Sequence, residues 1–282
     1  MKGFVVTPMR QEIELEAGGV YEGYITVVNP ADAEEDFRYT ASISPYSVSD
    51  EYDVDLETRS TMNQMVDWVK LEDASGVLKP NEDRKIKYTI TVPADAPAGG
   101  QYVAIGVTED LGDTLQNTQG THIYDVMQLS SVIYAEIAGE TERGGKIVSN
   151  KVPGFVTQLP AKIELVLEND GNVHERADIK MEVKNLLSGE VLYPREDDPE
   201  KIEEIIMPAT IRNISRDIDV LGDLGVYQVT HNVEYLGESS NITQNIIVCP
   251  LWFMALVAAT ILAAIMTVVA LVVRRKKQRR II

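Results

Sequence analysis

The sequence contains almost no cysteine, since Cys249 is the only one among 282 residues. An intrachain disulfide is therefore excluded, and so is a small domain held together by disulfides. An exported protein with so few cysteines is more typical of Gram-positive-type surfaces than of animal ones. Cys249 itself is left for an intermolecular disulfide, for lipidation, or for no modification at all.

Catalytic motifs are also missing. The three histidines, His122, His174 and His231, are far apart in sequence and none has a metal-ligand spacing. A nucleophile elbow, a phosphate-binding loop and an HExxH helix are absent from the sequence as well. The sequence therefore favours a protein that is not an enzyme and carries no cofactor. His174 follows an Asp-Gly-Asn turn, and we expect it on the surface of a strand.

One acidic run is a weak candidate for calcium binding. Its carboxylates follow one another along a short segment: Asp50, Glu51, Asp53, Asp55 and Glu57. On one side of an extended chain they would converge on a calcium ion, which prefers about six to eight oxygen ligands. The glycine turn and ligand spacing of a calcium loop are lacking, so a solvated acidic loop is the alternative. The same applies to the acidic stretch 196–200.

Positive charge is scarce outside the C-terminal tail. The chain has 44 Asp and Glu against 26 Lys and Arg, and six of those cations lie after residue 273. The part before the tail therefore carries 44 acids and 20 bases, a net charge of -24. Such a surface repels nucleic acids and anionic headgroups. The sequence thus predicts no nucleic-acid partner and suits a solvated ectodomain.

The last hydrophobic run is 251–273, which has 23 residues without a charge. As a helix it spans roughly 34 Å, enough to cross a hydrocarbon core of about 30 Å. Arg274, Arg275, Lys276 and Lys277 follow at once, and the positive-inside rule places the tail 274–282 in the cytoplasm. The sequence thus predicts a single-pass cell-membrane protein with an extracellular N-terminal region. A buried core helix is the alternative.

Two features inside this run refine the prediction. Trp252 stands at the outer end, where an indole is stable in the headgroup layer. Ala255, Ala259 and Ala263 are spaced by four residues, as in small-xxx-small pairing, which would support a weak homodimer through the helix. The lipid bilayer is therefore the first predicted partner.

The first residues do not resemble a secretory signal. The stretch 1–8 has no apolar core of about 7–15 residues and no small-residue cleavage site. Because an extracellular region needs export, we expect a signal to precede residue 1 or to have been removed.

The region 1–138 is organised as short strands separated by turn signals. The predicted strands are Glu12–Glu16, Val20–Asn29, Phe37–Ile43, Trp68–Leu71, Arg84–Val92, Gln101–Thr108 and Gln128–Ala138. Gly76–Pro80 is predicted as a turn, and 60–67 as either one helical turn or an irregular loop. Trp68 is expected to pack between sheets. Without a convincing amphipathic helix, the pattern predicts a β-sandwich.

A junction rich in glycine and proline is expected at 139–160, followed by a second sandwich at 161–246. The predicted strands there are Ala161–Asn169, Ala177–Val183, Pro208–Val220 and Val226–Tyr235. We expect a charged loop at 196–204 and a polar hairpin end at 237–245. The predicted fold class is all-β, with two tandem Ig-like antiparallel β-sandwich domains followed by one transmembrane helix.

Several short motifs resemble a known surface family. In the first half they are Phe4–Pro8, the Gly18-Gly19 turn, Ile25–Asn29, Leu78–Asn81, Tyr88–Pro93 and Gly99–Tyr102; in the second half they are Leu167–His174, Met207-Pro208, Gly225–Tyr227 and Asn232–Gly237. The first set is similar to the peptidoglycan-binding domain of WxL-interacting proteins, and the second to that family's other Ig-like domain. The resemblance implies a prokaryotic envelope protein that contacts the cell wall and holds a surface partner. No binding residue is matched individually.

Two functional hypotheses follow. The first is a membrane-anchored surface protein that binds cell-wall polymer, a protein partner or both through its Ig-like domains, as an adhesin or scaffold. The alternative is a membrane-tethered chaperone or assembly factor for the subunits of a surface fibre. An unpaired, hydrophobic edge strand in the first domain would favour the chaperone, and a charged or covered edge would disfavour it.

Overall fold

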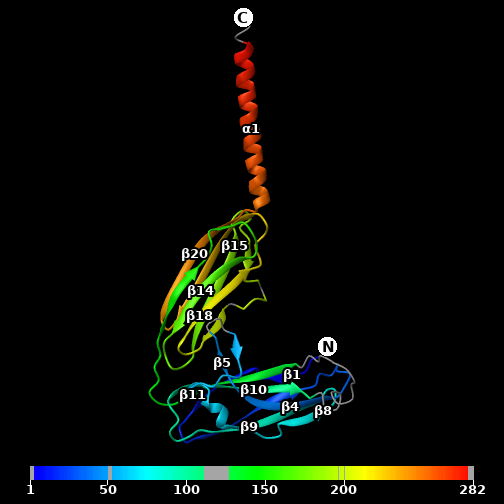
Figure 1. Ribbon diagram of the computed structural model, residues 1–282, viewed down its shortest axis with the longest axis vertical. Coiled ribbons are helices and arrows are strands. Elements are labelled where there is room, and N and C mark those ends of the chain that lie inside the picture. Colours follow the sequence, from blue (N-terminus) through cyan, green and yellow to red (C-terminus); the bar gives the residue numbers. More distant parts are fainter. Residues whose placement is uncertain (1–2, 50–52, 111–126, 196, 200, 279–282) are drawn as a thin grey trace. The chain divides into compact units, whose positions relative to one another are not determined.

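The computed structural model describes residues 3–49, 53–110, 127–195, 197–199 and 201–278. The protein is mostly β-structure with one long helix at its C-terminal end (Figure 1). It divides into two compact units. The first comprises Met1–Gly145 with Asn169–Glu175 and Met207–Arg212, and the second comprises the rest of the chain.

The first unit is a sandwich of two sheets. One sheet has the order β1 (Val5–Thr7), β3 (Val20–Val28), β9 (Asp83–Thr91) and β7 (Val69–Leu71). The other has the order β2 (Arg10–Leu15), β11 (Gln128–Ile137), β10 (Gly99–Glu109), β4 (Phe37–Pro45) and β8 (Ser75–Leu78). A small hairpin of β5 (Ser47–Val48) and β6 (Val54–Asp55) and a 3-10 helix, η1 (Gln64–Asp67), complete it.

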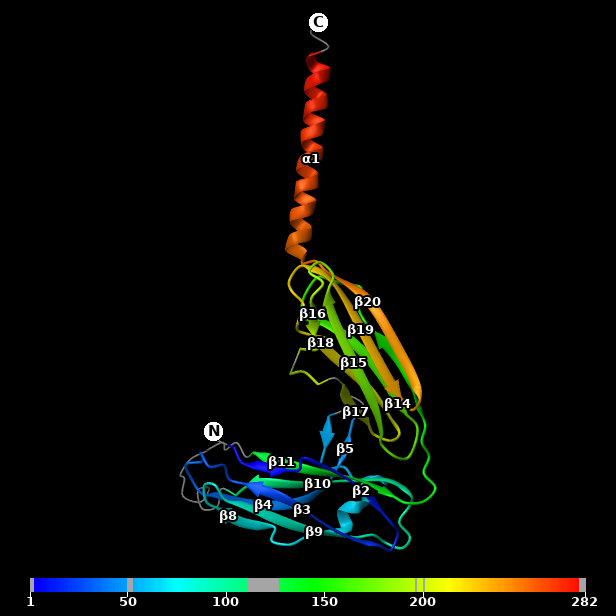
Figure 2. The ribbon, with the colours of Figure 1, turned by 180° about the vertical axis from the view of Figure 1, so that it is seen from behind.

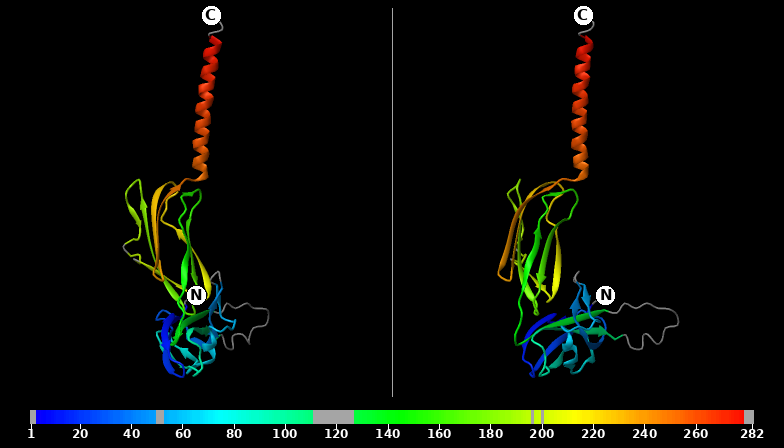
Figure 3. Two further views of the ribbon diagram at one scale, coloured as in Figure 1. Left: turned by 90° about the vertical axis from the view of Figure 1, so that its left-hand side faces the viewer. Right: turned by 60° about the vertical axis from the view of Figure 1, so that its left-hand side comes forward.

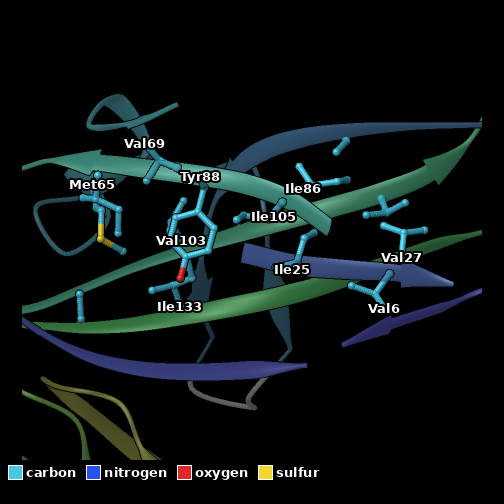
Figure 4. Close-up of a cluster of buried hydrophobic side chains, with 14 of the residues drawn as sticks. Val6, Ile25, Val27, Met65, Val69, Ile86, Tyr88, Val103, Ile105 and Ile133 are labelled. Carbon is cyan, nitrogen blue, oxygen red and sulfur yellow. The ribbon is translucent and has the colours of Figure 1, made fainter. Parts of the chain in front are cut away.

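The core of this sandwich follows from the period-two alternation of its strands. In Figure 4, Ile25 of β3, Ile86 of β9 and Ile105 of β10 lie close together, and Ile133 of β11 lies beside Tyr88 and Val103. All four isoleucine side chains are fully buried. The side chain of Met65, in η1, closes one end of the same cluster. In β3, β4 and β9, alternation thus placed one face in the core, as expected, whereas β10 is buried on both faces.

Two features of the first unit differ from the prediction, and a third agrees with one of its alternatives. The segment 76–78, expected as a turn, belongs to strand β8, which pairs with β4 and buries Leu78. The segment 60–67 contains η1, so its helical-turn alternative is confirmed. β2 runs parallel to β11, so the sandwich is not wholly antiparallel. β11 lies between β2 and β10 and is thus an interior strand.

The second unit is built from two further sheets, whose strands are seen side by side in Figure 2. The smaller has the order β12 (Gly145–Lys151), β14 (Ala161–Asn169) and β18 (Thr210–Ile218). The larger has the order β13 (Phe155–Val156), β20 (Glu238–Val248), β19 (Gly225–Tyr235), β15 (Glu175–Asn185) and β16 (Val191–Tyr193), with β17 (Ile202–Ile206) also paired with β15.

Strands also replace predicted loops in this unit. The stretch 139–160, expected as a junction, contains β12 and β13, because β12 pairs with β14 and β13 pairs with β20. The stretch 237–245, expected as a polar hairpin end, is most of the 11-residue strand β20. The end of the expected charged loop, Ile202–Glu204, lies in β17, while Glu196 and Glu200 lie outside the described residues.

The helix α1 (Leu251–Gln278) follows directly after β20 (Figure 3). Its segment Leu251–Val272 has a mean hydropathy of 2.7 and none of it is buried. In the described part of the chain this is the one helix that is long and apolar enough to cross a membrane.

Candidate binding edges of the first sandwich

The N-terminal segment of the chain changes sheets between Thr7 and Arg10. Before the change, β1 pairs with β3, but only over Thr26–Val28. After it, β2 pairs with β11, but only over Val132–Ile137. Each sheet therefore has an outer strand that covers only part of its neighbour. Pro8, which has no N–H to donate to either sheet, lies at the change.

The longer of the uncovered segments is Val20–Ile25 of β3, here called the β3 edge. The N–H of Val92 donates to the carbonyl of Gly19, so the backbone groups of Gly19 point towards β9. Every second residue from Gly19 onwards then also bonds to β9. By alternation, Val20, Glu22 and Tyr24 direct their N–H and C=O groups away from β9. No described strand pairs with this side of the β3 edge. Three donors and three acceptors are thus available there.

The side chains of the β3 edge divide between two faces. On the outer face, Val20 is 66% exposed and Tyr24 is 51% exposed. On the inner face, Tyr21 is partly buried and packs against the core. A strand added beside β3 would bury Tyr21 further. On the outer face, its side chains would contact Val20 and Tyr24.

Charges on the outer face are held by neighbours in β9. The ammonium of Lys85 lies 4.4 Å from the ring centroid of Tyr24. Lys87 Nζ lies 2.7 Å from Glu22 Oε1, and this carboxylate raises the pKa of the lysine. Both contacts run towards β9 rather than across the open side. They therefore leave the backbone of the β3 edge accessible.

Gly23 and Tyr88 fix the backbone of this edge. A Cβ at Gly23 would lie 2.3 Å from the Tyr88 hydroxyl, so only glycine fits beneath the ring. The Tyr88 hydroxyl donates to Gln11 Oε1 at 3.0 Å, which links β9 to β2 in the opposite sheet. A tyrosine is already protonated at neutral pH, and burial raises the pKa of Tyr88 further above that range.

The second uncovered segment, Gln128–Ser131 of β11, is shorter and more polar. Leu129 is partly buried against the core, while Ser131 is buried and lies 3.4 Å from Gln11 Nε2. The strand that completes this edge, β2, is charged, with an Arg10–Glu12 ion pair at 3.3 Å. Of the two edges, β3 is therefore the longer and the more apolar.

Sequence reasoning found β3 as a strand but not as an edge. The alternation of apolar and polar residues in β3 indicates which face is buried. It does not indicate whether another strand pairs with each side of β3. The one signal was Pro8, because a proline between two short strands favours a break in pairing.

The predicted calcium residues are only partly described. Asp50 and Glu51 lie outside the described residues. Asp55 Oδ1 accepts the N–H groups of Glu57 at 2.8 Å and Thr58 at 3.0 Å, and hydrogen bonding lowers the pKa of this carboxyl. In the described ranges, no group of three or more His, Cys, Asp or Glu side chains is placed to hold a metal ion. Asp53 therefore belongs to no such group.

One of the three histidines, His174, differs from the expectation. His122 lies outside the described residues. His174, expected on the surface, has a side chain only 11% exposed and lies just before β15. The backbone N–H of His174 donates to the Tyr102 hydroxyl at 3.0 Å, and burial lowers the pKa of the imidazole. His231 is buried in the second sandwich.

The residues predicted near the membrane lie on and beside α1. Cys249 is partly exposed, and its N–H donates to the carbonyl of Val156. Trp252 is exposed and its ring packs edge-on against Phe253. Arg274 is exposed, whereas the side chains of Arg275, Lys276 and Lys277 are outside the description. Trp68 is partly buried and packs against the first core, as expected.

One cavity of about 380 Å³ lies in the first unit. Phe4 and Phe37 form part of its wall, with ring centroids 4.3 Å apart. Its other lining residues include four acids, namely Glu34, Glu35, Asp36 and Glu109. This acidic lining is unsuited to an anionic polymer.

The sequence matches no protein-family model and no curated protein. Among solved structures, it is similar to a chaperone–tip adhesin complex of CFA/I fimbriae biogenesis, with 12% identity, coverage of 86% of this chain and 98% of that chain, and a TM-score of 0.41. It is also similar to the SafB chaperone complex with SafA pilin from Salmonella enterica, with 10% identity, coverage of 88% and 97%, and a TM-score of 0.42. These similarities assign no function to this chain.

Proposed function

We propose that this chain is a non-enzymatic surface protein, anchored by α1, that binds an extended segment of a protein partner at the β3 edge. The observation that supports the proposal is the unpaired backbone of Val20, Glu22 and Tyr24. An added strand would bond to up to six backbone groups there. Backbone pairing selects a polypeptide, so a protein partner suits this edge better than a wall polymer.

The membrane part of the proposal rests on α1. Leu251–Val272 has the length and hydropathy of a spanning helix, and Arg274 begins a basic cluster. The tail 274–282 would then be cytoplasmic and both sandwiches extracellular. The resemblance to WxL-interacting proteins is a prediction from the sequence that is consistent with this arrangement.

A second candidate is a membrane-tethered chaperone for the subunits of a surface fibre. The exposed apolar side chains of Val20 and Tyr24 beside an open backbone favour it, because a chaperone must shield an apolar strand of its client. The charged β2 disfavours the opposite edge. The two candidates share a binding edge and differ in whether the bound partner is later released into a fibre.

The test distinguishes the contribution of the backbone N–H to binding from that of the side chain, both at Glu22. Glu22→Pro removes an outward N–H without removing a bond to β9, whereas Glu22→Ala removes the side chain and its ion pair but keeps the N–H. Full-length wild type and both variants, in detergent micelles, are compared in pull-downs from surface protein extracts and, separately, on purified wall polymer. Circular dichroism checks that each variant is folded.

A protein retained by wild type and Glu22→Ala but lost with Glu22→Pro would support strand addition. Equal retention by folded Glu22→Pro, or retention of polymer alone, would overturn it. If the retained protein is a fibre subunit and fibre yield falls in cells without this chain, the chaperone candidate is preferred.

A further inference from the structure

The second unit carries a row of apolar side chains at the end that leads into α1. The row crosses four strands of the larger sheet. The N–H of Leu186, just after β15, donates to the carbonyl of Val226 in β19 at 2.9 Å. Val226 is opposite Ile247 in β20, and Ile247 is opposite Phe155 in β13. Residues directly opposite share a face, so these four form one continuous apolar row.

The rows farther from α1 on the same face are polar. The next consists of Lys184, Gln228 and Asn245, and the ones after it are Glu182, Thr230 and Thr243, then Lys180, Asn232 and Asn241. The hydroxyls of Thr230 and Thr243 lie 3.3 Å apart across the strands. Within β15, β19 and β20, apolar side chains on this face are therefore confined to the row nearest α1. Val191 of β16, which is opposite Lys184 in the next row, is also apolar and is 50% exposed.

Two loop tips extend the apolar row. Leu187, in the turn after β15, is 78% exposed, and Leu224, just before β19, is 48% exposed. Within the row itself, Phe155 and Ile247 are 51% and 46% exposed. Val148 in β12 and Ile211 in β18 are also exposed, but they belong to the smaller sheet, on either side of β14. We call Phe155, Leu186, Leu187, Leu224, Val226 and Ile247 the apolar end.

The apolar end is tied closely to the start of α1. β20 ends at Val248 and α1 begins at Leu251, so only Cys249 and Pro250 lie between them. Three extended residue steps span at most about 11 Å. The N–H of Cys249 donates to Val156, the second residue of β13, which keeps this link beside Phe155. Figure 3 shows α1 continuing from this end of β20.

We propose that the apolar end sits in the headgroup layer of the membrane that α1 spans. This inference rests on the proposed anchoring by α1. Contiguous exposed apolar residues mark an interaction surface, and a surface two residues from a spanning helix is held at the lipid interface by its tether. Burying such side chains at the acyl boundary is favourable in proportion to their apolar area.

The contact is apolar rather than electrostatic. Lys184 lies in the neighbouring row, but Asp223 and Glu190 lie in the loops of the same end. Anionic lipids would attract Lys184 and repel Asp223 and Glu190. We therefore expect the apolar end to contact zwitterionic bilayers, and we expect this contact to be independent of salt. It would restrict the second sandwich from swinging about the short link at Cys249.

The experiment uses the full chain in phosphatidylcholine vesicles, with Cys249→Ser to remove the native thiol. Nitroxide labels are placed one at a time by Ser188→Cys next to Leu187 of the apolar end, Ser239→Cys at the start of β20, and Val257→Cys in α1. Accessibility to oxygen and to a water-soluble nickel complex then reports depth. We expect an oxygen-to-nickel ratio at Ser188 at least about threefold above that at Ser239, unchanged in 1 M salt.

Matched double variants identify the cause. Leu187→Asn with Leu224→Asn should return the Ser188 label to aqueous accessibility, whereas Val148→Asn with Ile211→Asn should leave its depth unchanged. An aqueous Ser188 label with a deep Val257 label would overturn the seating while the anchor stands. An aqueous Val257 label would overturn the anchor itself.

Discussion

His231 Nδ1 lies 2.7 Å from Asn150 Oδ1, a hydrogen bond that joins β19 to β12 through the interior of the second sandwich. An amide oxygen only accepts, so the imidazole donates and its Nδ1 carries the proton. The same asparagine donates through Nδ2 to the Ser240 hydroxyl at 3.1 Å. His231 lies between Val229 and Val233, which belong to two separate apolar clusters. The polar bridge therefore divides the core.

This bridge makes the second sandwich sensitive to acid. Burial, followed by the positive charge of Arg216, lowers the pKa of His231 to about 4, whereas an unfolded histidine has a pKa of about 6.5. The unfolded state therefore binds a proton first. Stability is complete above pH of about 6.5 and is lost as the pH falls towards 4, by up to about 3 kcal/mol. Hydrogen exchange of β12 and β19 at pH 5 and 7, corrected for intrinsic rates, measures the loss.

The control for this effect is His231→Asn. Its Nδ2 can still donate to Asn150 Oδ1, but it does not titrate. We expect the pH dependence of exchange in β12 and β19 to disappear in this variant. A variant that keeps the wild-type dependence would show that another group is responsible.

Two buried tyrosines of the first sandwich should respond oppositely to loss of their hydroxyls. The Tyr39 hydroxyl is buried without a hydrogen-bond partner among the described residues, whereas that of Tyr88 donates to Gln11. Tyr39→Phe should therefore stabilise by about 1 kcal/mol, and Tyr88→Phe should destabilise by a similar amount. Urea unfolding followed by Trp68 fluorescence, in a Trp252→Phe background, reports on this unit alone. Equal shifts of the same sign would contradict the assignment.

Gly23 should tolerate no side chain. A methyl group there would meet the Tyr88 ring, which is buried and cannot move without breaking its bond to Gln11. Gly23→Ala should destabilise the first sandwich by about 2–4 kcal/mol in the same urea assay. Gly18→Ala is the control, because its Cβ would meet neighbours only at 3.8 Å and the cost is the positive φ of 77°, about 1 kcal/mol.

Much of this fold could be predicted because alternation survives in the core strands. β9 alternates Ile86, Tyr88 and Ile90 with polar residues, and all three are buried. β20 was missed because its inward positions include Ser240 and Gln244, which interrupt the apolar period. β8 was missed because Gly76 and Pro80 are typical turn residues. The burial of Leu78 and the pairing with β4 nevertheless stabilise a strand there.

The candidate sites were harder to predict for a physical reason. The openness of the β3 edge depends on where β1 leaves its sheet, and that is decided by the pairing of residues more than a hundred positions apart, such as Arg10 and Val132. The apolar end depends on four strands brought into register. His174 was misplaced because the partner that buries it, Tyr102, is 72 residues away in sequence.

The acidic run around Asp55 should not bind calcium tightly. Asp55 Oδ1 already accepts two backbone N–H groups, from Glu57 and Thr58, so it acts as the acceptor of a local turn. Millimolar calcium should leave the unfolding temperature of the full chain unchanged, because a ligand stabilises only when it binds the native state. Asp55→Asn, which keeps an acceptor oxygen, should preserve the turn, while Asp55→Ala should accelerate amide exchange at Glu57 and Thr58. A calcium-dependent rise in unfolding temperature that Asp55→Asn abolishes would instead establish a metal site.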